Sequence, residues 1–357
     1  MEFGLITGGL GFIGSCIARR LVKEGFVEKV VLVDHYGGYV SPIKQGYVDY
    51  RKQRIIDIED KIVIERALTN HSITMAKLLI KYRPKYIFHL AALPLASLEN
   101  MNPEEALEGT GISAGHILEA CDMLKQSQGY QPERFVYASS SMVYGDFQYT
   151  PADENHPTRP KDIYGTMKLA GEIVTRGLSG VYGLRSTIIR PSAVYGPTDM
   201  NRRVSQIFVE NAIIGKQLIV HGADEALDFT YVEDTAKGFV LAGTRKEAVG
   251  ETFNITTGAA HTLLEFVQVL KEIFPNLDYK VVERDLAKPK RGTLSIEKAR
   301  NVLGFQPDYD LRSGVRAYVE FVKAHYPNYP FNTTKLNLLE RNVENNRTSG
   351  SSMSAKH

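Results

Sequence analysis

The sequence predicts an α/β fold in which a doubly wound parallel sheet is joined to a smaller C-terminal α/β lobe. Short apolar runs rich in β-branched residues recur through the first 190 residues. Uninterrupted runs of this kind are typical of parallel strands that are buried on both faces. Amphipathic stretches alternate with them, which gives the βαβ order of a doubly wound sheet. The expected strands are residues 3–7, 30–34, 54–58, 86–90, 134–139 and 185–190.

Helical patterns fill the intervals, and their regularity changes after residue 191. The first part of the chain has expected helices at 12–24, 73–83, 103–126 and 162–178. The second part has expected helices at 202–214, 233–243, 262–273 and 311–325, with short strand-like pieces between them. No linker rich in proline and glycine separates the parts, so we expect the two lobes to share a cleft. A polar tail follows from residue 332 to 357 and is predicted to be flexible.

The bulk composition excludes several classes of protein. The 357 residues are 43% hydrophobic and 24% charged, as in ordinary soluble proteins. A net charge of +2 with scattered basic residues argues against nucleic-acid binding. The two cysteines form neither a disulfide framework nor a metal-ligand spacing, so no metal is expected. No apolar run is long enough to span a membrane and no signal peptide precedes the first strand, which favours a soluble, cytoplasmic protein.

A glycine-rich turn joins the first expected strand to the first expected helix. Its glycines are Gly8, Gly11 and Gly14, and the helix begins near Phe12 and Ile13. Glycine permits the backbone angles of a tight turn and the close approach of a pyrophosphate. The start of the helix offers free N–H groups and a positive dipole end to that anion. The segment therefore predicts a dinucleotide site in a Rossmann-like domain over residues 1–190.

Asp34 ends the second strand, 20 residues after Gly14. A carboxylate at this place accepts hydrogen bonds from an adenosine ribose and repels a 2′-phosphate. The cofactor is therefore expected to be NAD rather than NADP.

Tyr164 and Lys168 stand four residues apart at the start of an expected helix, so their side chains share one face. A free phenol has a pKa of about 10 and is a poor base at neutral pH. A neighbouring ammonium group favours the phenolate and makes the tyrosine usable as a general base. The pair predicts proton abstraction from a hydroxyl group.

These motifs together resemble the extended branch of the short-chain dehydrogenase/reductase family over residues 2 to 325. The segment Ala138-Ser-Ser-Ser-Met-Val-Tyr-Gly145 is similar to the one that carries the catalytic hydroxyl, and the resemblance assigns this role to Ser140. It implies that Lys168 also bonds the nicotinamide ribose and that residues 191–331 mainly form a substrate-binding lobe. Further cofactor contacts are implied for Asp57 and Ile58 after the third strand and for Leu90, Ala91 and Ala92 after the fourth.

The residues after Ser140 bear on the reaction. Related 4,6-dehydratases of nucleotide sugars resemble one another in an Asp-Glu pair, and related decarboxylases keep the glutamate, whereas this chain has Ser141 and Met142. A thioether cannot transfer a proton. The resemblance then favours a nucleotide-sugar 4-epimerase that oxidises C4 transiently by hydride transfer to NAD. A 4-dehydrogenase with a keto product, an epimerase at another carbon, and an inert NAD-binding regulator stay open as alternatives.

Substrate contacts are harder to assign from the sequence. Leu227 stands where related epimerases often place an arginine on the diphosphate, so Arg203 or Arg291 is expected to replace it, since a guanidinium suits phosphate. Ser140, Ser141 and Asn201 complete the expected substrate contacts.

Two segments depart from the family pattern. Gly109 and Thr110 take the place where many relatives have an asparagine, and residues 35–54 form a long connection of unassigned role. The resemblance also implies a homodimer that packs helices 103–126 and 162–178 against a second subunit. The nucleotide base and the sugar are not specified by these residues.

Overall fold

The computed structural model describes residues 1–35, 50–92, 103–201 and 203–325 of the chain. Its centre is a seven-stranded parallel sheet in the order β3-β2-β1-β4-β5-β6-β9, which confirms the predicted fold class. Strands β1 to β3 are added toward one edge of the sheet and the later strands toward the other, so the strand order reverses between β1 and β4, as in a doubly wound fold. The strands are β1 (Phe3–Thr7), β2 (Lys29–Asp34), β3 (Ile62–Arg66), β4 (Tyr86–His89), β5 (Arg134–Ala138), β6 (Ser186–Pro191) and β9 (Thr252–Ile255).

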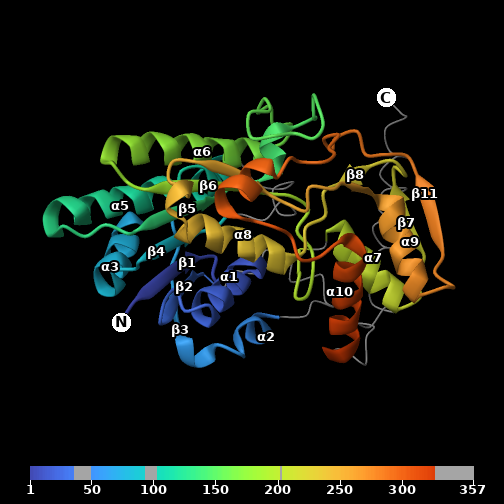
Figure 1. Ribbon diagram of the computed structural model, residues 1–357, viewed down its shortest axis with the longest axis horizontal. Helices are drawn as coiled ribbons and strands as arrows, with labels where there is room; N and C mark the ends of the chain where they lie inside the picture. The colour runs from blue at the N-terminus through green and yellow to red at the C-terminus, as the bar shows by residue number, and fades with distance from the viewer. Residues whose placement is uncertain (36–49, 93–102, 202, 326–357) are drawn as a thin grey trace, which may run out of the picture.

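Helices cover both faces of this sheet (Figure 1). One face packs on α1 (Phe12–Lys23) and α8 (Val232–Thr244) through a core that includes Ile6 and Leu32. The other face packs on α3 (Ser72–Tyr82), α5 (Ser113–Gln128) and α6 (Ile163–Tyr182) through a core that includes Leu5 and Val31. Adjacent residues of one strand thus enter opposite cores, since side chains alternate along a strand. This double burial explains the uninterrupted apolar runs of the sequence.

The third strand lies later in the chain than predicted. The expected strand at 54–58 is wrong: α2 (Arg51–Ile55) occupies its first half, a 3₁₀ turn (Glu59–Lys61) follows, and β3 begins at Ile62. Arg54 holds this helix in place, because its guanidinium donates to the Leu10 carbonyl at 2.7 Å and to the Thr198 carbonyl at 2.5 Å. β3 is the edge strand of the sheet and is only half-buried.

The expected helix at 103–126 is broken into pieces. A short α4 (Pro103–Ala106) leads into a π-helical turn (Leu107–Gly111), and α5 starts anew at Ser113. Two glycines in this turn disfavour a regular helix. Thr110, within the turn, is 1% exposed. A π-helical turn often marks a functional region, and this one packs against α6.

A second lobe contains α7 (Val204–Ile213), α9 (Leu263–Ile273) and α10 (Leu311–His325) around a core of its own. β7 (Leu218–His221) pairs with β11 (Tyr279–Val282), and β8 (Ala226–Leu227) pairs with β10 (His261–Thr262). Between these pieces the chain returns to the large sheet through α8 and β9, which the sequence pattern does not reveal. Remaining short turns are Ser141–Tyr144, Lys246–Ala248 and Ala299–Leu303.

The predicted tail at 332–357 and most of the 35–54 segment lie outside the described residues. Within the described part of the chain, no helix combines the length and the apolar character that crossing a membrane requires.

Candidate functional site

The glycine-rich turn is a cradle that side chains would fill. Gly8 has φ of +67°, and a Cβ there would lie 3.1 Å from the Ala91 amide nitrogen. A Cβ on Gly11 would lie 2.8 Å from the Gly8 carbonyl oxygen, and one on Gly14 would clash with the same oxygen. The first turn of α1 thus lies directly against the loop, with its free N–H groups at the carboxyl end of β1. These residues fit a dinucleotide pyrophosphate.

Gly9 also has a packing role that the sequence did not single out. A Cβ on Gly9 would lie 2.8 Å from the Cβ of Leu32 on β2. This close approach, one residue after Gly8, fixes the loop against the strand that leads to Asp34. Of the helix-start residues, Phe12 is buried in the core and Ile13 is half-buried against it.

Asp34 lies at the carboxyl end of β2, beside the same loop. The Leu10 amide donates to its Oδ2 atom at 3.2 Å. Across the sheet, Asp34 is in register with Arg66 of β3. The carboxylate is therefore anchored beside the phosphate cradle, where an adenosine ribose is expected.

Asp57 and Ile58 occupy a different place from the one expected. They precede β3 instead of following it, because the predicted third strand is a helix. The Asp57 carboxylate accepts from Arg19 Nε at 2.9 Å and from Lys23 Nζ at 2.6 Å, both on α1, and Ile58 is 2% exposed in the core. These ion pairs and hydrogen bonds lower the pKa of Asp57 against the effect of burial. The observed contacts tie α1 to the segment before β3.

The end of β4 contributes a buried polar chain. Thr7 Oγ1 bonds His89 Nδ1 at 2.7 Å and accepts from the Ala91 amide at 3.2 Å, and His89 Nε2 bonds Ser113 Oγ at 3.0 Å. Burial and then the charge of Lys168 lower the pKa of His89 to about 3. His89 is therefore neutral, and its bond to Thr7 orients the hydroxyl group that holds the Ala91 backbone beside the glycine cradle.

The structure brings together Tyr164 and Lys168, whose spacing predicts a shared helix face, and Ser140, which the family resemblance assigns to the same site. Asp162 caps α6 by accepting from the Gly165 amide at 2.7 Å, which places Tyr164 in the first turn. The Ser140 hydroxyl hydrogen-bonds Tyr164. Lys168 Nζ donates to the Ala138 carbonyl at 2.7 Å and lies 5.8 Å from the centre of the Tyr164 ring. Serine, phenol and ammonium thus form one cluster at the carboxyl end of β5.

Burial governs the protonation of this cluster. It lowers the pKa of Lys168 to about 7, and the nearby Glu172 carboxylate opposes that shift. Burial also raises the pKa of Tyr164, while the Arg203 charge and the bond with Ser140 lower it and Asp162 raises it. The pKa of Tyr164 is raised on balance, and the Arg203 charge and the Ser140 hydroxyl are the groups that oppose this effect and favour the phenolate, the form that a general base requires.

Ser141 and Met142 follow Ser140 in a short turn and are both buried. Ser141 is 1% exposed, and its hydroxyl group has no protein partner among the described residues. The Met142 amide donates to Ser140 Oγ at 3.2 Å, which orients that hydroxyl toward the helix. No carboxylate stands at either position.

Arg203 and Arg291 approach the catalytic cluster from the second lobe. The Arg203 charge acts on both Tyr164 and Arg291, and Arg203 Nη1 donates to the Val194 carbonyl at 3.3 Å. Burial lowers the pKa of Arg291 to about 10, with Asp162 opposing that effect. The Nε atom of Arg291 has no protein partner within the described ranges. Two guanidinium groups therefore face the same region.

Asn201 and Leu227, two further positions considered from the sequence, differ in their contacts. Asn201 donates to Asp199 Oδ1 from its backbone at 3.1 Å and from its side chain at 3.2 Å. Leu227 lies on β8 opposite His261 and packs against the core of the second lobe. Asp199, 1% exposed, was not singled out from the sequence, because its burial depends on the fold of the second lobe.

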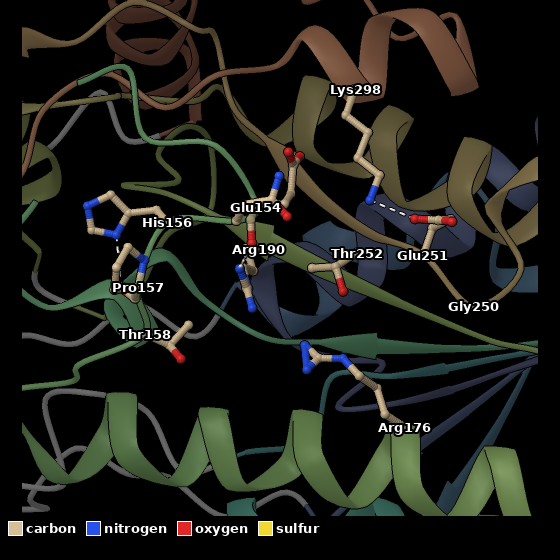
Figure 2. Close-up of a pocket in the computed structure, with 11 residues that line it drawn as sticks. Glu154, His156, Pro157, Thr158, Arg176, Arg190, Gly250, Glu251, Thr252 and Lys298 are labelled. Atoms are coloured by element: carbon tan, nitrogen blue, oxygen red, sulfur yellow. Dashed lines mark hydrogen bonds and ion pairs between the residues drawn. The ribbon is translucent and has the colours of Figure 1, made fainter. Parts of the chain in front are cut away.

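A cavity of about 400 Å³ lies beside the edge strand β9, away from the catalytic cluster (Figure 2). Arg176 points toward it from α6, and Lys298 pairs across it with Glu251 at 2.6 Å. None of Ser140, Tyr164 and Lys168 lines it. Within the described part of the chain, no three histidine, cysteine or carboxylate side chains gather as metal ligands.

The family follows from comparison with known proteins. Residues 4–256 match the NAD dependent epimerase/dehydratase family. The chain belongs to this family. The matched region contains the glycine cradle, Asp34 and the catalytic cluster, and it ends after β9. The family uses NAD, as the sequence predicted.

Individual members are similar to most of the chain. UDP-glucuronate 4-epimerase 1 of Arabidopsis thaliana is 28% identical over 345 residues, which cover 90% of this chain and 77% of that protein. dTDP-glucose 4,6-dehydratase 1 of Escherichia coli is 27% identical, covering 89% of this chain and 91% of that protein. The crystal structure of UDP-glucuronic acid 4-epimerase from Bacillus cereus with UDP-glucuronic acid and NAD has a TM-score of 0.80 and 25% identity, covering 91% and 100% of the two chains. Epimerases and a dehydratase are thus about equally similar to this chain in sequence. The residues of the site must therefore distinguish between the two reactions.

Proposed function

We propose that this protein is an NAD-dependent 4-epimerase of nucleotide sugars. The observation that carries the proposal is the cluster in which Tyr164 bonds Ser140 and shares a helix face with Lys168, beside a glycine cradle. Its similarity to UDP-sugar 4-epimerases over about 90% of the chain supports the same conclusion.

The residues of the cluster perform the proton transfers. Tyr164, as phenolate, takes the proton of the sugar 4-hydroxyl, and the Ser140 hydroxyl orients that group. Lys168 stabilises the phenolate by its charge. NAD, when bound, accepts the hydride of C4 and later returns it. After the keto sugar has turned over, Tyr164 gives its proton back to the oxygen on the inverted carbon.

The cofactor fits the residues at the ends of β1, β2 and β4. The cradle of Gly8, Gly11 and Gly14 with the first amides of α1 suits the pyrophosphate, and Asp34 suits the ribose. The segment Leu90 to Ala92, held by Thr7 and His89, forms the opposite wall. Lys168 would reach the nicotinamide ribose.

The residues after Ser140 favour epimerisation over dehydration. Loss of water from a 4-keto sugar requires groups that abstract and donate further protons. Ser141 is a weak acid without a base beside it, and Met142 has no titratable group. Epimerisation needs only the tyrosine, the serine and the hydride, all of which this site can supply.

Arg203 and Arg291 are the proposed contacts to the substrate diphosphate. Both guanidinium groups face the region of Tyr164 from the second lobe, and Arg291 Nε has no protein partner among the described residues. Paired guanidinium groups bind phosphate oxygens well. They would take the role of the arginine that related epimerases often have at the position of Leu227. The epimerase relatives are named for UDP-glucuronate and UDP-glucose, so these two UDP-sugars are the first substrates to test.

We further propose a cytoplasmic homodimer. Three large apolar side chains are exposed on α5 and α6: Met123 is 59%, Ile173 61% and Val181 79% exposed. Ile173 and Val181 are eight residues apart and lie on one face of α6. A second subunit packed on this face would cover them, and light scattering would measure the mass.

Product analysis tests the proposed function. The purified protein is incubated with a panel of UDP-, GDP-, CDP- and dTDP-sugars, with absorbance to follow reduced nicotinamide and NMR to identify products. The proposal expects an inverted C4 centre without net NADH. A released keto sugar with accumulating NADH would identify a dehydrogenase instead, and silence with all substrates would contradict the proposal.

A further inference from the structure

A buried polar network lies directly behind the catalytic cluster. It consists of Ser139, Tyr144, Glu172 and Arg190, none of them more than 3% exposed. Arg190 donates to Glu172 through two parallel bonds, from Nε to Oε1 at 2.8 Å and from Nη2 to Oε2 at 2.7 Å. A bidentate pair of this kind has high geometric specificity. Removal of either partner would leave a buried charge without compensation.

Three members of the network lie close to a catalytic residue in the chain or on the same helix, and Arg190 on β6 joins them. Glu172 is one turn after Lys168 on α6. Ser139 precedes Ser140 and donates to Glu172 Oε1 at 2.5 Å. Tyr144 ends the turn that follows Ser140 and accepts from Arg190 Nη1 at 2.9 Å. The network therefore bonds the Ser140 segment on both sides and joins it to the helix of Tyr164 and Lys168.

We propose that the Glu172–Arg190 pair positions the catalytic cluster, by fixing the Ser140 segment against the helix face that carries Tyr164 and Lys168. This proposal rests on the proposed function for its kinetic consequences. Glu172 and Arg190 do not touch the substrate, so they are positioning residues. A catalytic site tolerates little displacement, since about 1 Å can cost about 100-fold in rate.

The network also has an electrostatic effect on the cluster. Four groups face Lys168: Tyr164 and Glu172 on α6, Tyr137 on β5 and His89 on β4. His89 and Tyr137 are neutral at pH 7, because burial lowers the pKa of the first and raises that of the second. Glu172 is therefore the anion that opposes deprotonation of Lys168. Without the Glu172 charge, Lys168 would lose its proton at lower pH.

The outer side of the network, toward the cavity beside β9, also has polar partners. Arg176 bonds Glu172 Oε2 from the solvent side, and Arg190 Nη1 donates to the Glu154 carbonyl at 3.2 Å (Figure 2). Tyr144 donates onward to Asn254 Oδ1 on β9 at 2.8 Å. Every polar atom of the Glu172 carboxylate thus has a partner, so its orientation is well defined.

Two variants test the proposal. Glu172→Gln keeps the shape of the side chain but removes its charge, and Arg190→Lys keeps the charge but removes the forked geometry. We expect each to lower kcat at least about tenfold with KM within about twofold, because the displaced groups act in the transition state. In Glu172→Gln the alkaline limb of the kcat profile should also move to lower pH, as Lys168 loses its proton earlier.

A measurement without turnover separates positioning from activity. The NAD-loaded protein is titrated with pH, and phenolate absorbance is compared with that of the same protein carrying Tyr164→Phe. The difference gives the pKa of Tyr164 alone among the 19 tyrosines. Glu172→Gln should raise this pKa, because a displaced Ser140 no longer donates its hydrogen bond to the Tyr164 oxygen, while Arg203 and Asp162, which also act on Tyr164, are unchanged. An unchanged titration together with unchanged kcat would overturn the proposal.

Arg134→Gln is the matched control. Arg134 is a 4% exposed arginine at the opposite end of β5, and it donates to Thr187 Oγ1 at 2.9 Å. Its loss should lower Tm without changing kcat or the titration of Tyr164. Equal effects of both variants on kcat would show a loss of stability rather than of positioning. If Arg190→Lys does not fold, Tyr144→Phe removes one bond to Arg190 and should reproduce the fall in kcat in weaker form. A wild-type protein that forms no epimer would refute the proposed function, whereas the titration would still decide the role of Glu172.

Discussion

Replacement of Lys168 by methionine should abolish activity and at the same time stabilise the protein at neutral pH. Lys168 is 4% exposed, and burial lowers its pKa from 10.5 to about 7. A shift of about 3.5 units corresponds to about 5 kcal/mol, at about 1.4 kcal/mol per unit. This is the cost of keeping the ammonium charged in the folded protein. Loss of the hydrogen bond to the Ala138 carbonyl offsets about 1 kcal/mol of the stabilisation in the variant.

The net gain of Lys168→Met is therefore about 3 to 4 kcal/mol at or below pH 7. The unfolding entropy of a chain of this length is about 0.7 kcal/mol/K, so Tm should rise by about 5 °C. The assay is thermal unfolding of the cofactor-free protein, followed by circular dichroism at a series of pH values. Exposed Lys216→Met is the control and should leave Tm unchanged.

The pH dependence gives a second check on the same variant. The folded pKa of Lys168 is below the unfolded one, so between about pH 7 and 10.5 the unfolded chain holds a proton that the native protein has lost. Wild-type stability therefore rises relative to the variant across this window, and the difference in Tm should shrink toward pH 10.5. A variant that is less stable than wild type at pH 7, or a difference independent of pH, would refute the reasoning.

Three further predictions concern the cofactor and the substrate. Gly14→Ala should weaken NAD binding at least about tenfold by titration calorimetry, because its Cβ clashes with the Gly8 carbonyl; unchanged affinity would contradict the cradle. Asp34→Asn should raise the affinity for NADP relative to NAD, since the carboxylate no longer repels a 2′-phosphate, and an unchanged ratio would place the ribose elsewhere. Arg203→Gln and Arg291→Gln should each raise the KM for the nucleotide sugar about tenfold with NAD affinity preserved; an equal loss of both would indicate a structural role instead.

The chemistry of the site could be predicted from the sequence where it depends on local spacing. Tyr164 and Lys168 four residues apart on a helix must share a face, and glycines at 8, 11 and 14 must form a turn at a helix start. Both follow from the geometry of one element and its neighbour. The alternation of buried strands and helices likewise predicts the doubly wound sheet.

Features that depend on distant contacts could not be predicted. The third strand could not be placed from the sequence because the run ending at Ile58 resembles a strand as much as β3 does, and only the Arg54 bonds to Leu10 and Thr198 fix that run as a helix and turn. Asp57 was displaced with it. The pair of Glu172 and Arg190 becomes visible only when β6 lies beside α6, although Glu172 stands four residues after Lys168, which was a usable signal.

The return of the chain to the sheet at β9 could not be predicted for the same reason, since it depends on distant contacts. Thr252–Ile255 is a run of four residues, too short to distinguish from other strand-like pieces of the second lobe. Its place beside β6 is fixed by long-range pairing and by the Tyr144 bond to Asn254.

The central claim is transient oxidation at C4 followed by return of the same hydride. It is tested most directly with a UDP-sugar that carries deuterium at C4, incubated with the purified protein in ordinary water and analysed by NMR and mass spectrometry. The account predicts a C4 epimer that retains its deuterium, and no epimer from the Tyr164→Phe variant. An epimer that has exchanged its deuterium with water, or a keto sugar as the only product, would contradict it.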